Sequence, residues 1–279
     1  MPGAKFYPRR RTFAPRFCGH RSIGSKPQPA LSLNLTLDIG NTRAKVGLFD
    51  GNRLVEQAIW TAWTLEELSS YGNQAGAERV VVASVLEDDP ALRRHLAERF
   101  VVALELTRET PLPFRNAYRT PETLGKDRLA AVAGAQALFP GESCLVIDCG
   151  TCIKYDLLTA DGTYRGGNIA PGAAMRIRAM HAFTARLPEV AMRMPDELIG
   201  YSTETALQNG ALRGAVLEME GFIQQFEKRS GLLRVLLTGG DAAFFLPYLP
   251  APRLTHEPNL TLHGLNHILQ FNENQYKTP

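Results

Sequence analysis

The feature that most constrains the fold of this chain is a short pattern that occurs twice. One copy spans Asp38 to Thr42 and the other, 110 residues later, spans Asp148 to Thr151. Each copy follows an apolar run and leads into a second extended run, which ends at an Asp-Gly turn. A single Asp-x-Gly segment would indicate only a turn. Its repetition in the same setting predicts two related halves.

A strand that ends in Asp-x-Gly and folds straight back has the chemistry of a phosphate-binding hairpin. Glycine lets the backbone turn and approach a ligand closely, and backbone N–H groups with a Thr or Asn side chain can donate hydrogen bonds to phosphate oxygens. The Asp carboxylate repels phosphate, so a cation is needed between them. Two such hairpins predict a site for a nucleotide polyphosphate and its metal ion, as in the superfamily of actin, heat-shock ATPases and sugar kinases.

Hydrophobic periodicity predicts similar elements in both halves, an antiparallel meander followed by helices and further strands. In the first half the expected strands cover 33–39, 43–49, 53–60, 78–84 and 100–105, and the expected helices cover 64–74, 89–98 and 126–138. In the second half the expected strands cover 143–149, 152–159, 163–169 and 232–237, and helices follow Pro171-Gly172 and cover 203–228 and 260–271. We therefore expect an α/β fold of two ribonuclease-H-like domains, at 31–140 and 141–279.

The first 30 residues differ from the rest of the chain in composition. They carry seven Lys or Arg residues, five prolines and no acidic residue. Because this stretch lacks hydrophobic periodicity, it cannot bury enough surface to order itself, and we interpret it as a dispensable extension rather than an organelle transit sequence. The whole chain has 31 basic and 28 acidic residues. The remainder is therefore mildly acidic, which gives no reason to expect a nucleic-acid partner.

Several other functions lack support in the sequence. No apolar run approaches the roughly 18 residues of a membrane-spanning helix, and neither a Walker A pattern nor G-x-G-x-x-G occurs. The six histidines show no metal-binding pairing. Cys149 and Cys152 form a C-x-x-C pattern, which is compatible with redox chemistry or half of a zinc site. Since they flank the turn of the second hairpin, we interpret them as small residues of a tight turn and expect a reducing cytoplasm.

Five motifs together resemble the ordered motifs of type III pantothenate kinases, over about residues 34 to 270. They are the segment from Asp38 to Thr42, the segment from Gly125 to Arg128 with Tyr118 and Pro121 before it, the segment from Asp148 to Thr151, the turn from Gly166 to Gly172, and the turn from Thr238 to Asp241. The resemblance implies ATP-dependent phosphorylation of pantothenate to 4'-phosphopantothenate, the first step of coenzyme A biosynthesis. It also implies a need for Mg²⁺ and for a monovalent cation, K⁺ or NH₄⁺.

The resemblance assigns site residues to each motif. The residues implied to bind ATP are Asp38, Ile39, Gly40, Asn41, Thr42, Arg43, Ala44, Lys45 and Thr151, with Asp38 near the metal and the γ-phosphate. The residues implied to form the acceptor pocket are Tyr118, Gly125, Lys126, Asp127, Arg128 and Thr203. Asp148 is implied to hold the monovalent cation.

Asp127 is the predicted catalytic base. It follows Gly125 at the start of a predicted helix, where the positive end of the helix dipole keeps a carboxylate ionised and able to accept a hydroxyl proton. Arg128 offers the planar fork that suits the pantothenate carboxylate. Taken alone, the Asp-Arg pair would indicate only a helix-start Asp and a surface Arg.

One residue departs from the family pattern. Many relatives have Thr where this chain has Lys154, just before Tyr155 and Asp156. A cation at this position could partly replace the bound monovalent ion. The departure puts the potassium requirement in doubt but leaves the reaction unchanged.

Small residues recur every four positions on two of the predicted helices. One stripe is Ala130, Gly134 and Leu138, and the other is Ala206, Gly210 and Gly214. Such stripes let helices approach closely, either in ordinary core packing or at a subunit interface. The resemblance implies a homodimer in which the second subunit completes the acceptor site.

Two other functions stay open at this point. A different kinase of the superfamily, acting on a sugar or a small acid, would share Asp38 and Asp148 but would have no reason to place Asp-Arg at 127 and 128. A non-catalytic regulator built on the same scaffold would tolerate loss of Asp127.

Overall fold

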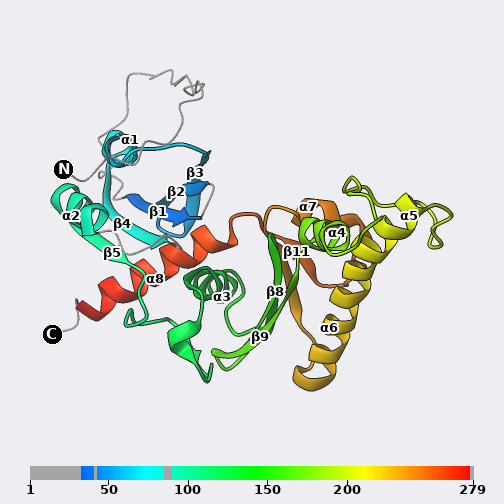
Figure 1. The fold of residues 1–279 in the computed structure, drawn as a ribbon. Helices are drawn as coiled ribbons and strands as arrows, with labels where there is room; N and C mark the ends of the chain where they lie inside the picture. Colours follow the sequence, from blue (N-terminus) through cyan, green and yellow to red (C-terminus); the bar gives the residue numbers. More distant parts are fainter. Residues whose placement is uncertain (1–32, 41–42, 85–89, 277–279) are drawn as a thin grey trace, which may run out of the picture. The chain divides into compact units, whose positions relative to one another are not determined.

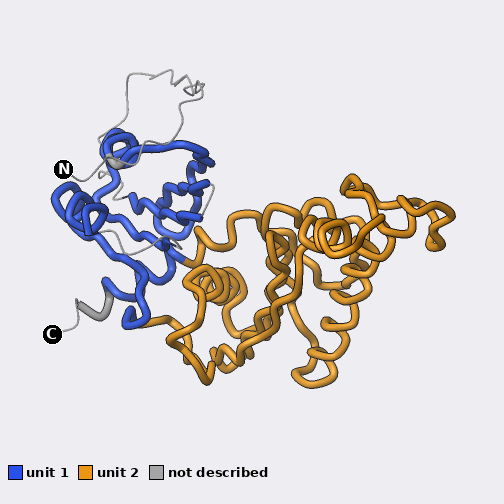
Figure 2. The backbone as a smooth tube through the Cα atoms, in the orientation of Figure 1, with its two compact units in different colours: residues 1–110, 265–279 blue, residues 111–264 orange. Residues whose placement is uncertain are grey.

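The computed structural model describes residues 33–40, 43–84 and 90–276. The chain divides into two compact units, residues 1–110 with 265–279 (unit 1) and residues 111–264 (unit 2), drawn in blue and orange in Figure 2. The predicted extension at 1–30 lies outside the described residues. No helix within the described ranges is long and apolar enough to cross a membrane.

Unit 1 is a five-stranded mixed sheet with helices. Its elements are β1 (Leu33–Ile39), β2 (Ala44–Asp50), β3 (Arg53–Trp60), α1 (Leu65–Ala75), β4 (Ala77–Ser84), α2 (Pro90–Arg99) and β5 (Val102–Glu105). The strand order is β3-β2-β1-β4-β5, with β1 antiparallel to β2 and parallel to β4. Helix α1 begins at a capping box, since Thr64 Oγ1 accepts from the Glu67 backbone N–H at 3.1 Å and Glu67 Oε2 accepts from the Thr64 N–H at 2.9 Å.

Unit 2 repeats this sheet and adds one short edge strand. Its elements are β6 (Arg115–Asn116), a 3₁₀ turn (Pro121–Thr123), α3 (Lys126–Leu138), β7 (Cys144–Cys149), β8 (Cys152–Thr159), β9 (Thr163–Pro171), α4 (Ala173–Ala182), α5 (Thr203–Gln208), α6 (Gly214–Ser230), β10 (Arg234–Thr238), α7 (Ala242–Phe245), a 3₁₀ turn (Leu246–Tyr248) and β11 (Leu254–His256). The strand order β11-β10-β7-β8-β9-β6 matches that of unit 1 when β7 takes the place of β1. The predicted duplication is therefore confirmed (Figure 1).

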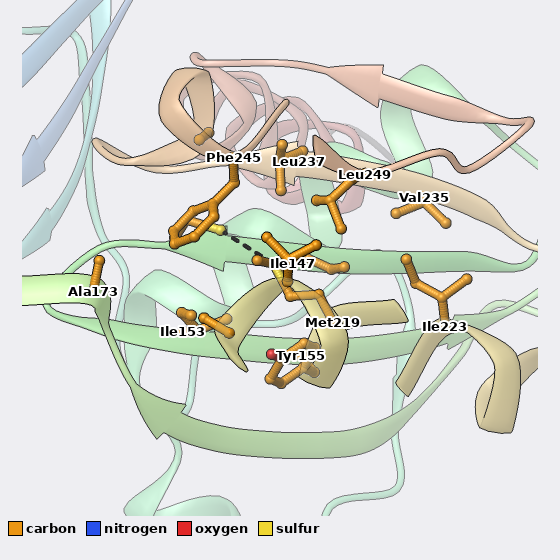
Figure 3. Packing of buried hydrophobic residues seen from close by; sticks show 14 of the residues in the cluster. Ile147, Ile153, Tyr155, Ala173, Met219, Ile223, Val235, Leu237, Phe245 and Leu249 are labelled. Atoms are coloured by element: carbon orange, nitrogen blue, oxygen red, sulfur yellow. Dashed lines mark hydrogen bonds between the residues drawn. The ribbon is translucent and has the colours of Figure 1, made fainter. Parts of the chain in front are cut away.

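The apolar core of unit 2 lies between one face of its sheet and helices α4 and α6 (Figure 3). Tyr155 is fully buried there, with its ring centroid 4.5 Å from that of Phe222 and its hydroxyl donating to Glu218 Oε1 at 2.8 Å. Because successive side chains of a strand point to opposite faces, the neighbours of Tyr155 on β8 point away from this core. They point to the face that α3 covers, and Figure 1 shows α3 and α6 on the two sides of this sheet.

The last helix, α8 (Leu260–Tyr276), belongs to both units. Its first turns lie in unit 2, where a Cβ atom added to Gly134 would stand 2.2 Å from the Leu260 carbonyl oxygen and one added to Gly264 would stand 1.7 Å from the Ala130 carbonyl oxygen. The small residues of α3 thus admit another helix of the same chain. Of the two interpretations of this stripe, core packing applies at Gly134, because α8 of the same chain covers it.

The remainder of α8 completes unit 1. Asn266 Oδ1 accepts a hydrogen bond of 2.7 Å from the buried Asn34 side chain on β1, and Glu273 pairs with Arg79 on β4 at 2.9 Å. The expected domain boundary at 140 therefore differs from the observed division. Helix α3 packs on β7 and β8 of unit 2, while the C-terminal residues 265–276 pack on the N-terminal sheet.

The helix predicted at 203–228 is interrupted. A π-helical turn over Asn209–Arg213 separates α5 from α6. A Cβ atom added to Gly210 would meet nothing within 4 Å, so this glycine faces open space in the single chain. Such π-turns are rare and occur mostly as single turns within α-helices.

Candidate active site

The second hairpin, β7 and β8, brings an acid and a base together by its strand register. Asp148 pairs with Lys154 across the antiparallel strands, and residues paired in this way point to the same face of a sheet. Gly150 closes the turn by donating its N–H to the Cys152 carbonyl at 3.1 Å. The hairpin therefore presents a carboxylate and an ammonium group side by side.

The Lys154 ammonium lies between two carboxylates. Its Nζ atom is 2.7 Å from Asp148 Oδ2 and 2.6 Å from Asp127 Oδ2 at the start of α3. Burial alone would lower the pKa of Lys154, but the charges of Asp148 and Asp127 and the hydrogen bonds to both hold its pKa well above the ordinary lysine range. Lys154 is therefore a fixed positive charge, and 18 % of its side chain is exposed.

Asp127 is held ionised by its neighbours. Burial raises the pKa of its carboxyl group. The Lys154 charge and hydrogen bond, together with the backbone N–H of Arg128, lower the pKa by more than burial raises it, so the net pKa is below the ordinary Asp value. The Arg128 N–H donates to Asp127 Oδ1 at 2.9 Å. With 29 % of its side chain exposed, Asp127 combines an ionised carboxylate with access from outside, which a general base needs.

Gly125 makes room for this carboxylate. It is the N-cap residue of α3 with a φ of −64°, a value that any residue adopts. A Cβ atom added there would stand 2.4 Å from Asp127 Oδ1. A larger residue at this position would therefore displace the Asp127 carboxylate from its observed place.

Arg128 is buried and paired within the chain. Its Nη2 and Nε donate to Asp156 Oδ1 at 2.6 and 3.0 Å, and the two side chains are 5 % and 1 % exposed. The Tyr164 hydroxyl donates to the same carboxylate oxygen at 2.7 Å. Although burial opposes it, this pairing raises the pKa of Arg128 further above its ordinary value. Arg128 is therefore not the surface arginine that its position alone would indicate.

Tyr118 lies next to Arg128. The guanidinium carbon is 5.4 Å from the centre of the Tyr118 ring, which suits a cation–π contact. The same ring stacks on Tyr164 with centroids 6.1 Å apart. A Cβ atom added to Gly166 would stand 3.0 Å from the Tyr118 ring. The structure thus brings together Tyr118 and the start of α3, two parts of the predicted acceptor pocket.

The turn that follows β10 closes against the second hairpin. Thr238 pairs with Asp148 in the parallel register, and the Asp241 N–H donates to the Cys149 carbonyl at 2.9 Å. Gly239 has a φ of +96°, and an added Cβ atom would stand 2.4 Å from Asp148 Oδ1. Only glycine fits this place, both for its conformation and for its distance from the carboxylate.

The first hairpin, β1 and β2, has a closely similar register in unit 1. Asp38 pairs with Lys45 and Ile39 with Ala44, and the Gly40 N–H donates to the Arg43 carbonyl at 2.9 Å. Asn41 and Thr42 lie outside the described residues. Ile39 and Ala44 are buried, whereas Asp38, Gly40 and Lys45 are partly exposed and Arg43 is exposed.

Two predicted residues lie away from the start of α3. Thr203 is an exposed residue at the start of α5, and α5 lies on the other side of the unit 2 sheet from α3 (Figure 1). Thr151 is exposed in the turn of the second hairpin, where its carbonyl accepts from the Gly172 N–H at 3.1 Å. Lys126, the first residue of α3, is partly exposed.

Asp156 and Tyr164 were not among the predicted site residues. A signal for Asp156 exists in the sequence, because Lys154 and Asp156 flank Tyr155 at a spacing of two and so share one face of a strand. Tyr164 carries no comparable signal, since its contact with Asp156 depends on the pairing of β8 with β9.

The cysteines are part of the sheet and its turn. Cys144, Cys149 and Cys152 are free thiols in the described chain, and the first two are fully buried. Burial raises the pKa of Cys144 to about 12, so this thiol does not ionise near neutral pH. Among the described residues no group of three or more His, Cys, Asp or Glu side chains is arranged to hold a metal ion.

Comparison with known proteins places this geometry in a family. The family model of type III pantothenate kinase matches residues 34–225. A type III pantothenate kinase of Phocaeicola vulgatus is 42 % identical over 241 residues, covering 86 % of this chain and 99 % of the relative. One of Christiangramia forsetii is 39 % identical over 245 residues, covering 87 % and 100 %.

A solved structure agrees at the level of the fold. The ROK hexokinase of Thermus thermophilus superposes with a TM-score of 0.51 at 18 % sequence identity, covering 86 % of this chain and 99 % of that one. This likeness confirms the predicted actin and sugar-kinase fold without bearing on the acceptor. Since the family model covers more than half of the chain and the relatives match nearly their whole length, the chain belongs to the type III pantothenate kinase family.

Proposed function

We propose that this protein transfers the γ-phosphoryl group of ATP to the primary hydroxyl of pantothenate, giving 4'-phosphopantothenate for coenzyme A biosynthesis. Family membership supports the reaction, and one observation of the structure carries the assignment of residues. The Asp127 carboxylate, at the start of α3, lies 2.6 Å from the cation that also contacts Asp148 of the second hairpin. The proposed base and a hairpin of the phosphate-binding type therefore share one cluster within unit 2.

In the proposed mechanism Asp127 accepts the proton of the acceptor hydroxyl as its oxygen attacks the γ-phosphorus, and ADP leaves. Phosphoryl transfer depends mainly on positioning and on neutralising charge. Asp127 suits the first task, because the Arg128 N–H and Lys154 Nζ bind its two oxygens and fix their direction. Of the predicted pocket residues, Gly125 and Arg128 belong to the same helix start, and Tyr118 contacts Arg128.

ATP binding is assigned first to the hairpin of unit 1. We propose that this hairpin binds the phosphates through residues 38–45. Asp38 has the chemistry to hold Mg²⁺, since its carboxylate is a hard oxygen ligand and is partly exposed at the end of β1. When bound, Mg²⁺ would neutralise charge on the phosphates, and Lys45 opposite Asp38 would add a second positive charge.

The acceptor site is proposed to be shared between two subunits. Thr203 lies on the opposite side of the unit 2 sheet from Asp127 within one chain. A homodimer reconciles this with the predicted role of Thr203, because Thr203 of the partner subunit would complete the pocket. The exposed face of α5 and α6 offers a surface for this contact, with open space at Gly210 and with Leu217 58 % exposed.

The reaction is tested by identifying the product. The purified chain is incubated with ATP and Mg²⁺ and a panel containing pantothenate, other hydroxylated acids and hexoses, and the products are identified by mass. We expect a single phosphorylated product, 4'-phosphopantothenate. Phosphorylation of a sugar in preference to pantothenate would contradict the proposal and would favour another kinase of the superfamily.

The shared site is tested by mixing two inactive variants. Asp127→Asn and Thr203→Val each impair both sites of their own homodimers. In a mixed dimer one site carries both substitutions and the other carries neither. If subunits exchange at random, half of the dimers are mixed and about one quarter of the wild-type activity should return. No gain on mixing, with exchange verified by differently tagged chains, would show that each pocket is built by one chain.

A further inference from the structure

We infer that the Lys154 ammonium is the resident cation of the second hairpin, so that this enzyme needs no monovalent metal ion between Asp127 and Asp148. The inference rests on the proposed function in one respect, namely that Asp127 is the base. Lys154 is a positioning residue in this scheme. It holds Asp127 and does not itself contact the acceptor.

The geometry shows that the place of a bound cation is already taken. Lys154 Nζ lies 2.6 Å from Asp127 Oδ2 and 2.7 Å from Asp148 Oδ2, distances typical of charge-assisted hydrogen bonds. A metal ion bound to the same two oxygens would lie in contact with the ammonium group, and like charges repel. Asp148, the residue implied to hold a monovalent cation, therefore does not fit one between itself and Asp127 while Lys154 is present.

Strand register fixes Lys154 in this place. Tyr155 is fully buried on the opposite face, and its hydroxyl donates to Glu218 Oε1 at 2.8 Å. A slip of one residue would move Tyr155 out of the core and Lys154 away from both carboxylates. The position of the cation is thus as well specified as the core of unit 2.

The charges around the ammonium group make its positive charge necessary. Asp127, Asp148 and Asp156 are three carboxylates on α3, β7 and β8, and Asp156 is neutralised by Arg128. Without Lys154, Asp127 and Asp148 would share one site with no cation between them. Holding them together would then require either an external cation or protonation of one carboxylate.

The first test is the response of activity to potassium. Wild-type protein is dialysed into choline chloride, and KCl replaces it at constant ionic strength while Mg²⁺ and ATP are kept saturating. We expect kcat to change less than twofold. Lys154→Thr should lose at least tenfold in kcat in choline chloride and recover several-fold in KCl, with a much smaller change in the KM for pantothenate. Arg94→Thr, which removes an exposed positive charge from α2 of unit 1, is the control and should behave as wild type.

The second test measures binding without catalysis. A ligand that binds only the folded state raises the melting temperature. Wild type should melt at the same temperature in KCl and in choline chloride, whereas Lys154→Thr should be stabilised specifically by KCl. Potassium-specific stabilisation and activation of the wild type would overturn the inference, and so would full activity of Lys154→Thr in choline chloride. If the protein fails to phosphorylate pantothenate at all, the proposed function fails while the wild-type melting comparison still decides the cation question.

Discussion

The two hairpins have similar strand pairing, but different helices pack on the sheets to which they belong. Each places a Lys opposite an Asp, Lys45 opposite Asp38 and Lys154 opposite Asp148. Four residues separate the paired Ile39 and Ala44 of the first hairpin. Three separate the paired Cys149 and Ile153 of the second. The sheets around them have the same strand order apart from the added edge strand β6.

The helices that pack on these sheets carry different chemistry. On the unit 1 sheet, α8 presents amides opposite β1, with Asn266 bound to Asn34 and to the Gly51 carbonyl, and its one described ion pair, Glu273 with Arg79, lies on β4. On the unit 2 sheet, α3 presents charges, with Asp127 bound to Lys154 and Arg128 bound to Asp156. The duplicated strands therefore do not determine where a catalytic base can lie. Its position is determined by the residues at the start of the helix that packs on the sheet.

The largest effect is expected at that helix start. Asp127→Asn keeps the shape of the side chain but removes the charge that accepts a proton, so kcat should fall by roughly 10²- to 10⁴-fold, while ATP binding and the melting temperature change little. Asp50→Asn in unit 1, at an exposed turn, is the control and should keep wild-type kcat. If Asp127→Asn kept a kcat near the wild-type value, Asp127 would not be the base, and the start of α3 would have no catalytic role that α8 lacks.

The next largest effect compares a buried ion pair with an exposed one. Arg128→Met leaves the Asp156 carboxylate, 1 % exposed, without its guanidinium partner, and breaking a buried pair costs about 3–5 kcal/mol. The corresponding fall in melting temperature is roughly 10 °C for a chain of this size. Arg53→Met in unit 1 removes a partner of Asp50 that is 73 % exposed, and it should cost less than about 1 kcal/mol. If calorimetry gave equal losses in the free energy of unfolding for Arg128→Met and Arg53→Met, the ion pair inside unit 2 would not contribute more than the exposed one.

Mirrored substitutions of the hairpin carboxylates separate their roles. Asp38→Asn should raise the Mg²⁺ concentration for half-maximal activity by about 10- to 100-fold, since a charged interaction contributes about 1.5–3 kcal/mol. Asp148→Asn removes one of the two anchors of Lys154. It should lower kcat several-fold without a comparable change in the Mg²⁺ requirement. Titration of Mg²⁺ at fixed ATP distinguishes the two, and identical curves would show that the hairpins act alike.

The smallest effect concerns glycines of the two helical layers of unit 2. Gly134→Ala places a methyl group against the Leu260 backbone and should cost about 1–3 kcal/mol, as overpacking does. Gly210→Ala meets open space in the single chain and should leave the free energy of unfolding unchanged or slightly increased. Denaturant titration measures both. If Gly210→Ala also weakens self-association in sedimentation experiments, the subunit contact lies at α5 and α6.

Much of the fold could be predicted because its determinants are local. The repeated Asp-x-Gly pattern and the alternation of apolar residues identified the strands of both meanders and the α3 helix to within about two residues. The division between units could not be predicted in this way. It depends on contacts such as Asn34 with Asn266, which no periodicity of either segment reveals.

The candidate site shows the same limit. The motif containing Asp127 and Arg128 predicted a charged helix start, and the register of the second hairpin follows from its short turn. The pairing of Arg128 with Asp156 was not predicted, because it requires the orientation of α3 on β8. The neighbour of Gly134 could not be predicted for a similar reason. A small residue indicates that another helix lies close, but not whether that helix belongs to the same chain or to a second subunit.

The split location of unit 1 along the chain bears on how the protein is made. The N-terminal sheet receives its covering helix from residues 265–276, more than 150 residues after β5 leaves the ribosome. Unit 2 is continuous from residue 111 to 264 and emerges before that helix does. During synthesis the Asn34 side chain of β1 therefore lacks its native partner Asn266 until that residue has been translated. A ribosome that stalls shortly before residue 265 leaves unit 2 complete, whereas the unit 1 sheet has only α1 and α2 on its apolar face and lacks the helix that binds Asn34.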